Sequence, residues 1–268
     1  MKARINKAWR IVATGLAFSI FGIGGMLLPL VVVPALYLWP ADPLVRERRA
    51  KRAIHYTMRG FVEIMRGLGI LTYTVENREA FNRPGQLILA NHPSLIDVVF
   101  LIAFIRNADC VVKSSLKRNP FTRGPINLAG YIANDDPEKI IEGTISSLAR
   151  GNSLIIFPEG TRTTPGEPLR LQRGAANVAL RAQVPITPVV ITCEPTTLTK
   201  GAPWYKVPSR RFHVEMRLQD NIDLETFADA GNPSRAARRL TRYLQEYFTR
   251  ELSLHEQRST ARTETANH

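Results

Sequence analysis

The sequence predicts an α/β fold with a mixed, largely parallel sheet flanked by helices, and an N-terminal membrane-embedded helical segment. From residue 70 onwards, apolar strand-like runs alternate with helical patterns, which is typical of a sheet covered by helices. Before them, residues 11–39 carry no charged side chain. Such a run is long enough to cross a bilayer as one helix.

Residues 1–40 are expected to form the membrane anchor. Pro29 and Pro34 interrupt the apolar run, and both of its flanks are basic. The positive-inside rule places both flanks in the cytoplasm, which favours a re-entrant helix pair that dips into one leaflet. A single span is the alternative. A signal peptide fits less well, because the apolar run exceeds a typical h-region and no clear small-x-small cleavage pattern follows it.

Residues 41–69 are expected to form an amphipathic helix at the membrane interface. Asp42 is a suitable N-cap and Pro43 suits the first helical position. Apolar residues then recur at helical spacing: Ala50, Ile54, Met58, Phe61, Met65 and Leu68. The early turns of this helix are basic and can contact anionic lipid.

Residues 70–252 are expected to form the α/β domain, and residues 253–268 a disordered tail because they are polar and aperiodic. The predicted strands are Leu71–Val75, Gln86–Ala90, Cys110–Lys113, Ser153–Phe157, Ile186–Thr192 and Phe212–Leu218. The predicted helices are Pro93–Ile105, Pro137–Ala149, Leu171–Ala182 and a last one that opens at Asn232–Pro233. In such sheets, functional sites gather where the strands end.

The composition indicates an anionic partner. The 268 residues include 36 Lys and Arg against 23 Asp and Glu, a formal net charge of +13. Membrane lipid is favoured over nucleic acid, because the aromatic residues do not interleave with the basic ones as a base-stacking surface requires. Cys110 and Cys193 are isolated in apolar runs and are read as buried thiols. No spacing of Cys and His is typical of a metal site, so no metal is predicted.

The first candidate motif, Asn91-His92-Pro93-Ser94-Leu95-Ile96-Asp97, directly follows a predicted strand. A neutral imidazole can remove a proton from a hydroxyl, and a carboxylate on its other nitrogen orients it and stabilises the imidazolium. His92 and Asp97 can take these roles if Pro93-Ser94 turns the chain tightly. The bland alternative is a structural histidine beside an aspartate.

The second candidate motif, Phe157-Pro158-Glu159-Gly160-Thr161-Arg162, also follows a predicted strand. Gly160 permits a close approach of the backbone to a ligand, and Arg162 offers a planar fork suited to phosphate. The bland alternative is a tight connection with a surface arginine. Both motifs are expected at the same edge of the sheet.

At these residues the sequence resembles the 1-acyl-sn-glycerol-3-phosphate acyltransferase family, the PlsC-like lysophospholipid acyltransferases. Residues 91–97 match the family's first motif, and residues 157–162 match its third. Two further stretches look like the second and fourth motifs: Lys113-Ser114-Ser115-Leu116 with Pro120, Gly124 and Gly130, and Val184-Pro185-Ile186-Thr187-Pro188-Val189. The likeness covers roughly residues 70–195.

The resemblance implies a membrane-bound O-acyltransferase that moves a fatty acyl group from an acyl thioester to the free hydroxyl of a lysolipid. It implies His92 as the base and Asp97 as its orienting group. The residues expected to bind substrate are Asn91, Lys113, Glu159, Gly160, Thr161 and Arg162. Glu159 organises the loop, and either Lys113 or backbone N–H groups near Gly160 steady the oxyanion.

One stretch departs from the family pattern. The second motif usually ends with an Arg shortly after its glycines, whereas this chain has Asn134-Asp135-Asp136. A carboxylate there would repel a phosphate unless Lys113 or Arg173 compensates. The most favoured acceptor is 1-acylglycerol-3-phosphate, and the alternatives are another lysophospholipid, a lyso-ornithine lipid or a specialised pigment lipid.

The resemblance further implies no bound cofactor, with acyl carrier protein or coenzyme A carrying the acyl group as co-substrate. It places the protein in a bacterial inner membrane, with the active site facing the cytoplasm. Alternatives from other classes are a non-catalytic lipid-binding membrane protein, a thioesterase or lipase, and a basic nucleic-acid binder. No Gly-x-Ser-x-Gly elbow is present, so no acyl-enzyme is expected.

Overall fold

The computed structural model describes residues 2–38, 42–119, 122–227 and 231–265. The helices are α1 Lys2–Leu38, α2 Pro43–Gly67, α3 Asp97–Phe104, α4 Ser114–Arg118, α5 Arg123–Leu128, α6 Pro137–Ala149, α7 Arg173–Ala182 and α8 Pro233–Thr265, with short 3-10 helices η1 Ala80–Asn82 and η2 Glu225–Phe227. The strands are β1 Leu71–Glu76, β2 Leu87–Ala90, β3 Ala108–Val112, β4 Ile132–Ala133, β5 Ser153–Ile156, β6 Ile186–Glu194 and β7 Phe212–Leu218.

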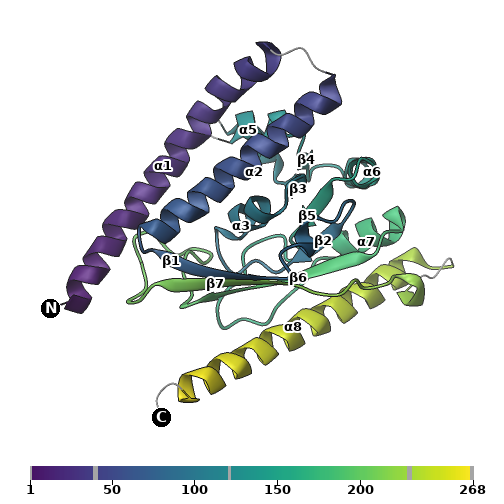
Figure 1. The fold of residues 1–268 in the computed structure, drawn as a ribbon. Helices are drawn as coiled ribbons and strands as arrows, with labels where there is room; N and C mark the ends of the chain where they lie inside the picture. Colours follow the sequence, from purple (N-terminus) through teal and green to yellow (C-terminus); the bar gives the residue numbers. More distant parts are fainter. Residues whose placement is uncertain (1, 39–41, 120–121, 228–230, 266–268) are drawn as a thin grey trace.

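The strands form one sheet in the order β1-β7-β6-β2-β5-β3-β4. Every neighbouring pair is parallel except β6 and β7, which are antiparallel. The predicted mixed, largely parallel sheet is therefore confirmed. Helices α1, α2 and α3 cover one face, and α6, α7 and α8 cover the other (Figure 1).

The central strands β2 and β5 are buried along their whole length. Successive side chains point to opposite faces, so Ile88 and Ile155 pack under α2 and α3 while Leu87, Leu89 and Leu154 pack under α7 and α8. Continuous apolar runs are what a strand buried on both faces requires, which is why these strands could be predicted.

All six predicted strands are present, with ends that differ by at most two residues. The short elements α4, α5 and β4 were not predicted, because none is long enough to show a period. Asp136 caps α6 by accepting a hydrogen bond from Glu138 N, as expected of this position.

The N-terminal segment does not break at its prolines. Helix α1 is continuous through Pro29 and Pro34, so the predicted helix pair within residues 1–40 is wrong. Each proline removes only one backbone hydrogen bond, which a long apolar helix tolerates. By length and composition, residues Asn6–Leu36 could cross a membrane.

Helix α1 packs along the α/β domain at both of its ends. The Arg10 guanidinium donates to the carbonyl of Ser209, and a methyl group at Gly124 would overlap Pro29. Helix α1 also packs against α2 and α5 (Figure 1). Its other face exposes a row of apolar side chains: Val12, Leu16, Ile23, Leu27, Leu30 and Val31.

Helix α2 matches the predicted amphipathic helix, with Asp42 accepting from Leu44 N and Pro43 at the first position. It buries an ion-pair network against the sheet. Lys51 Nζ lies 2.7 Å from Asp109 Oδ1 of β3 and 2.6 Å from Glu47 Oε1. Asp109 Oδ2 also accepts from Ser147 Oγ at 2.6 Å. This network fastens α2 to β3 and α6.

The predicted disordered tail is wrong over residues 253–265, where α8 continues as helix; residues 266–268 lie outside the described residues. His255 accounts for the continuation. Its Nε2 lies 3.2 Å from Thr192 Oγ1 and 3.1 Å from Glu215 Oε2, so a buried ring fixes the helix to β6 and β7. This contact could not be predicted from the sequence, because the segment is polar and a single histidine does not create a helical pattern.

Candidate active site

The two candidate motifs meet at one edge of the sheet. β2 and β5 are parallel neighbours, so both end at that edge. β2 leads into residues 91–97, and β5 leads into residues 157–162. The shared edge places both loops beside the same cleft, as is general for open parallel α/β sheets.

His92 and Asp97 form the predicted pair. His92 Nδ1 lies 2.9 Å from Asp97 Oδ2, and the same oxygen accepts from Ser94 N at 2.7 Å. The Asp97 carboxyl is fully buried, whereas 17% of the His92 side chain is exposed. Because the oxygen of an ionised carboxylate can only accept a hydrogen bond, Nδ1 carries the proton and Nε2 is left as the base.

The turn at residues 93–96 explains why α3 starts at Asp97 rather than at Pro93 as predicted. Five residues of separation do not align on a regular helix. The chain therefore stays non-helical until Asp97, with Asp97 N donating to the carbonyl of Ser94 at 3.4 Å. The expected tight turn is confirmed.

Burial shapes the electrostatics of both carboxyls in the site. Burial raises the pKa of Asp97, although hydrogen bonds from His92 and Ser94 act in the opposite direction. Burial likewise raises the pKa of Glu159, against the hydrogen bonds from His92 and Thr163. Burial therefore disfavours the ionised form of both carboxyls, and the hydrogen bonds that they accept partly offset this effect.

The third-motif loop holds the backbone of His92 on both sides. Glu159 Oε1 accepts from His92 N at 2.8 Å and from Thr163 Oγ1 at 3.0 Å. Thr163 N donates to the carbonyl of His92 at 2.7 Å. Glu159 thus organises the loop, as expected, and does so from a buried position.

Phe157 stacks on the imidazole, with ring centroids 4.1 Å apart and planes 21° apart. The sequence interpretation did not assign Phe157 a role. Its position as the first residue of the third motif, directly after a buried strand, was the available signal. The stacked ring and the hydrogen bond from Nδ1 to Asp97 together limit the rotation of the His92 ring.

Arg162 is held from behind by the segment after β6. Its NH1 donates to the carbonyls of Leu198 and Thr199 at 2.9 Å and 3.0 Å. Leu95 N donates to the same Leu198 carbonyl at 3.1 Å. This segment could not be predicted from the sequence, since backbone carbonyls can come from any residue type.

His92 opens onto a cleft of about 570 Å³. Of the predicted substrate-binding residues, Lys113, Gly160, Thr161 and Arg162 line it. No acidic residue among the described residues lines the cleft. Asp136, which was expected to repel a phosphate, instead caps α6, and Asn134 Oδ1 accepts from Ser114 N at 3.3 Å.

Two assignments need correction. Asn91 is buried away from the cleft, where its side chain donates to Ile191 O and accepts from Ile191 N, both at 2.7 Å. It ties β2 to β6 and does not line the substrate cleft. The N–H of Gly160 donates to the carbonyl of Phe157 at 3.0 Å and is not available to an oxyanion. Lys113 remains the cation that lines the cleft beside His92 and Arg162.

The two cysteines are free and buried. Burial raises the pKa of the Cys193 thiol to about 12 and that of Cys110 further still. Neither is a thiolate at neutral pH, so neither is a nucleophile. Among the described residues, no three His, Cys, Asp or Glu side chains are grouped to hold a metal ion.

A second cavity, almost entirely apolar, adjoins the cleft. Its volume is about 280 Å³, and it lies between α1, α2 and α3. Val98 and Leu116 line both spaces. The apolar cavity therefore lies next to the polar cleft, with these two side chains at their boundary.

Comparison with known proteins supports the resemblance. A family model described as "Acyltransferase" matches residues 72–192. The 1-acyl-sn-glycerol-3-phosphate acyltransferase of Helicobacter pylori is 32% identical over 124 residues, which are 44% of this chain and 52% of that protein. The enzyme of the same name from Cocos nucifera is 29% identical over 191 residues, 68% of this chain and 58% of that protein.

The chain thus spans about half the length of the curated relatives that it matches. A solved structure is similar over almost the whole chain. The 1-acyl-sn-glycerophosphate (LPA) acyltransferase PlsC of Thermotoga maritima superposes with a TM-score of 0.72 at 19% identity, covering 92% of this chain and 97% of that one. At this identity the likeness establishes the fold.

Proposed function

We propose that this chain, which matches the acyltransferase family model and is similar to 1-acyl-sn-glycerol-3-phosphate acyltransferases, transfers a fatty acyl group to the free hydroxyl of a lysolipid. The acyl group comes from a thioester of acyl carrier protein or coenzyme A. The acceptor is 1-acylglycerol-3-phosphate, and the product is phosphatidic acid. The observation that carries this proposal is the His92–Asp97 pair at the mouth of a cleft.

The reaction follows from the pair's geometry. Nε2 of His92 takes the proton of the acceptor hydroxyl while the oxygen attacks the thioester carbonyl carbon. Asp97 stabilises the resulting imidazolium through Nδ1–H. When the tetrahedral intermediate collapses, the C–S bond breaks, and His92 returns the proton to the leaving thiolate. One ester forms and one thioester is consumed, with no net change in protons.

The charges around the cleft suit a phosphate head group. Lys113 and Arg162 both line it, and its described lining contains no carboxylate. The contacts of Arg162 to Leu198 and Thr199 use NH1, so the remaining guanidinium nitrogens can donate to a phosphate. Lys113 is also placed to stabilise the oxyanion of the tetrahedral intermediate.

The adjoining apolar cavity suits a fatty chain. Each buried methylene contributes about 0.8 kcal/mol, so a long chain gains substantially from a dry pocket. Val98 and Leu116 connect this cavity with the cleft that contains His92. A chain lying in the cavity would enter it beside the reacting carbonyl.

Helix α1 supports attachment to a membrane from one side. Both ends of α1 contact the α/β domain, while Leu16, Leu27 and Leu30 expose apolar side chains along its outer face. A helix of this kind lies in one leaflet with the domain beside it. The cytoplasmic face of a bacterial inner membrane is the proposed location, because the acyl thioesters are made there and the flanks of α1 are basic.

The decisive experiment compares His92→Ala with His213→Ala, a half-buried histidine of β7 outside the cleft. Transfer of a labelled acyl group to 1-acylglycerol-3-phosphate should fall by about three orders of magnitude in His92→Ala. His213→Ala should keep its activity, and both variants should stay membrane-associated. Full turnover by His92→Ala would refute the proposal.

The same assay separates the alternatives. Release of free fatty acid without a new ester would identify a thioesterase or lipase. Acyl transfer to another lysophospholipid or to a lyso-ornithine lipid, but not to 1-acylglycerol-3-phosphate, would change the acceptor and keep the mechanism. Parallel reactions with acyl carrier protein and coenzyme A thioesters identify the donor.

A further inference from the structure

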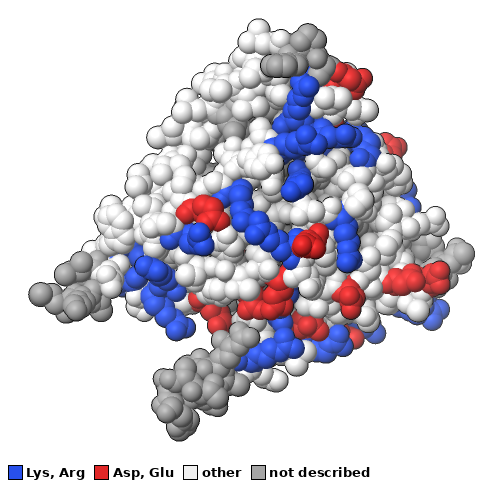
Figure 2. Space-filling model, viewed as in Figure 1, with Lys and Arg blue, Asp and Glu red and all other residues white. Residues whose placement is uncertain are grey.

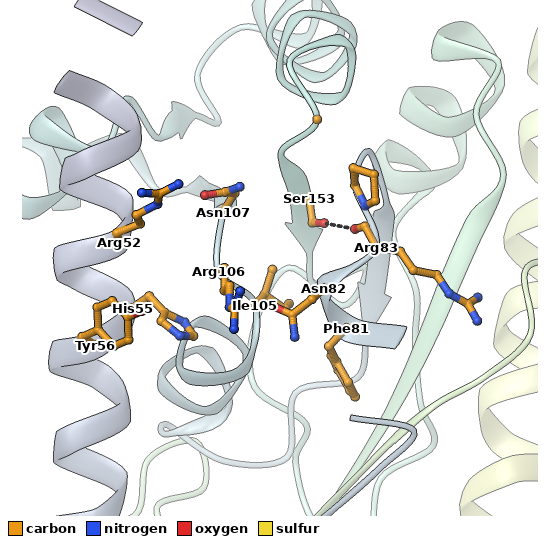
Figure 3. Close-up of a pocket in the computed structure, with 12 residues that line it drawn as sticks. Arg52, His55, Tyr56, Phe81, Asn82, Arg83, Ile105, Arg106, Asn107 and Ser153 are labelled. Carbon is orange, nitrogen blue, oxygen red and sulfur yellow. Dashed lines mark hydrogen bonds between the residues drawn. The ribbon is translucent and has the colours of Figure 1, made fainter. Parts of the chain in front are cut away.

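A second polar recess lies at the opposite edge of the sheet from His92, where β2, β3 and β5 begin. Figure 3 shows α2 on one side of it and the starts of β3 and β5 on the other. Its volume is about 470 Å³. The polar side chains that line it come from four separate segments: Arg52, His55, Tyr56, Asn82, Arg83, Arg106, Asn107 and Ser153.

Three arginines line this recess without compensating charge, and Figure 3 shows the guanidinium group of Arg83 extending away from those of Arg52 and Arg106. Arg52 comes from α2, Arg83 follows η1, and Arg106 follows α3. Within the described ranges, none of the three side chains has a hydrogen-bond or ion-pair partner, and no carboxylate lines the recess. Lys and Arg side chains also gather along α2 on the face shown in Figure 2.

The nearest acidic residues on the same elements are already engaged. Glu47 of α2 pairs with Lys51 and, through its other oxygen, with Arg150 at 3.2 Å. Asp109 of β3 pairs with Lys51 and accepts from Ser147. If either turned toward the recess, the buried Lys51 would lose one of its two carboxylate partners, which is costly. The cations at the recess therefore lack an internal counter-ion.

Fixed polar groups give the recess a defined wall. His55 Nδ1–H donates to the carbonyl of Ile102 at 2.8 Å, which orients the ring and leaves Nε2 for another partner. Figure 3 shows His55 reaching from α2 toward Ile105. Asn107 Oδ1 is buried with no partner in the described part of the chain, so the wall also holds an unused acceptor.

We propose that this recess binds a phosphate-bearing anion at a site separate from the catalytic cleft. Guanidinium groups match phosphate oxygens in shape and charge, and Arg52 and Arg106 bring two of them to the recess from separate elements. The proposal does not depend on the function proposed above. The phosphate can belong to a lipid head group or to a soluble compound, and the chemistry of recognition is the same.

The test uses the full-length protein in micelles of an uncharged detergent. One arm measures binding of inorganic pyrophosphate by calorimetry, and the other compares vesicles of phosphatidylcholine with and without phosphatidylglycerol. The variant is Arg52→Gln/Arg83→Gln/Arg106→Gln. The matched control is Arg235→Gln/Arg238→Gln/Arg242→Gln, which removes the same charge from exposed positions on α8.

The recess variant should bind at least about tenfold more weakly than the control, because the control leaves all three cations in place. Weaker pyrophosphate binding points to a soluble phosphate compound. A loss confined to the phosphatidylglycerol vesicles points to a lipid head group. Both variants should melt at the temperature of the unsubstituted protein, since the replaced guanidiniums hold no structural contact. Equal binding by the two variants in both arms would overturn the proposal, as would absence of binding by the unsubstituted protein.

Discussion

Among the described residues, two buried aspartates each lie beside a basic side chain, and only the pair of Asp97 opens onto the cleft described above. Asp97 and Asp109 are both almost completely inaccessible. Asp97 lies 2.9 Å from His92, whose ring is partly exposed. Asp109 lies 2.7 Å from Lys51, of which only 1% is exposed. The two pairs resemble each other in distance and burial and differ in access.

The difference shows that a buried ion pair does not by itself indicate chemistry. Lys51 has a second carboxylate, Glu47, and Asp109 has a second donor, Ser147, so that pair is closed on all sides. In the described part of the chain, Nε2 of His92 has no protein partner, and the ring borders a cleft of about 570 Å³. The Lys51–Asp109 pair fastens a helix to the sheet, and the His92–Asp97 pair can transfer a proton.

Asp97→Asn should give the largest effect on catalysis. An asparagine keeps the volume but cannot hold the imidazolium, so the rate of acyl transfer should fall by about three to four orders of magnitude. The melting temperature should not fall, because the substitution removes a buried charge. Activity measured beside thermal melting tests both expectations, and a folded variant with full activity would contradict the role of Asp97.

The stability of the same variant should depend on pH with a definite sign. Burial raises the folded-state pKa of Asp97 above its unfolded value of about 3.9. The stabilisation from its bound proton is present at low pH and is lost as the pH rises through the folded pKa. The stability of Asp97→Asn relative to the unsubstituted protein should therefore increase as the pH rises above about 4. Denaturant unfolding across this range measures it, and a difference that is constant with pH would contradict it.

Lys51→Met should show the reverse pattern. Removing one partner of a buried pair leaves Asp109 uncompensated, which costs about 3–5 kcal/mol in the free energy of unfolding. The specific activity of the protein that remains folded should change little. Adding Asp109→Asn should recover part of the loss, because an amide can still bond to Ser147. A loss of activity without a loss of stability would show that this pair takes part in catalysis.

Phe157→Leu should have a smaller effect. An aromatic contact contributes about 0.5–1.5 kcal/mol, so losing the stacked ring should lower kcat by up to about tenfold. Phe227→Leu is the control and should be neutral; Phe227 lies in η2, and its ring contacts that of Tyr243 at a tilt of 53°. Steady-state kinetics of both variants test this expectation. Equal kcat values for the two variants would show that Phe157 does not contribute to catalysis.

Glu159→Gln should have the smallest effect. The amide oxygen can still accept from His92 N and Thr163 Oγ1, so the rate should stay within about threefold. Glu159→Ala should be worse by about ten- to a hundredfold, because it leaves the buried N–H of His92 unpaired. If both variants lost the same activity, the charge of Glu159 would matter and its hydrogen bonds would not.

The sequence predicted the open pair and not the closed one, for a physical reason. His92 and Asp97 lie in one turn after a buried strand, so a local pattern contains both. Lys51 and Asp109 come from distant segments, and their pairing depends on how α2 lies on the sheet. The same limit applies to Leu198 and His255, whose contacts are made by the fold. The strands were predictable because burial on both faces requires continuous apolar runs.

The backbone at Leu198 has a consequence for selectivity. Its carbonyl accepts hydrogen bonds from the Arg162 guanidinium and from the N–H of Leu95. Leu198 also lines the apolar cavity. One residue therefore links the polar end of a lipid with its hydrocarbon end. Under the proposed function, enlarging residue 198 to favour a shorter tail should also shift the preference for head groups, so the two preferences would have to be selected together.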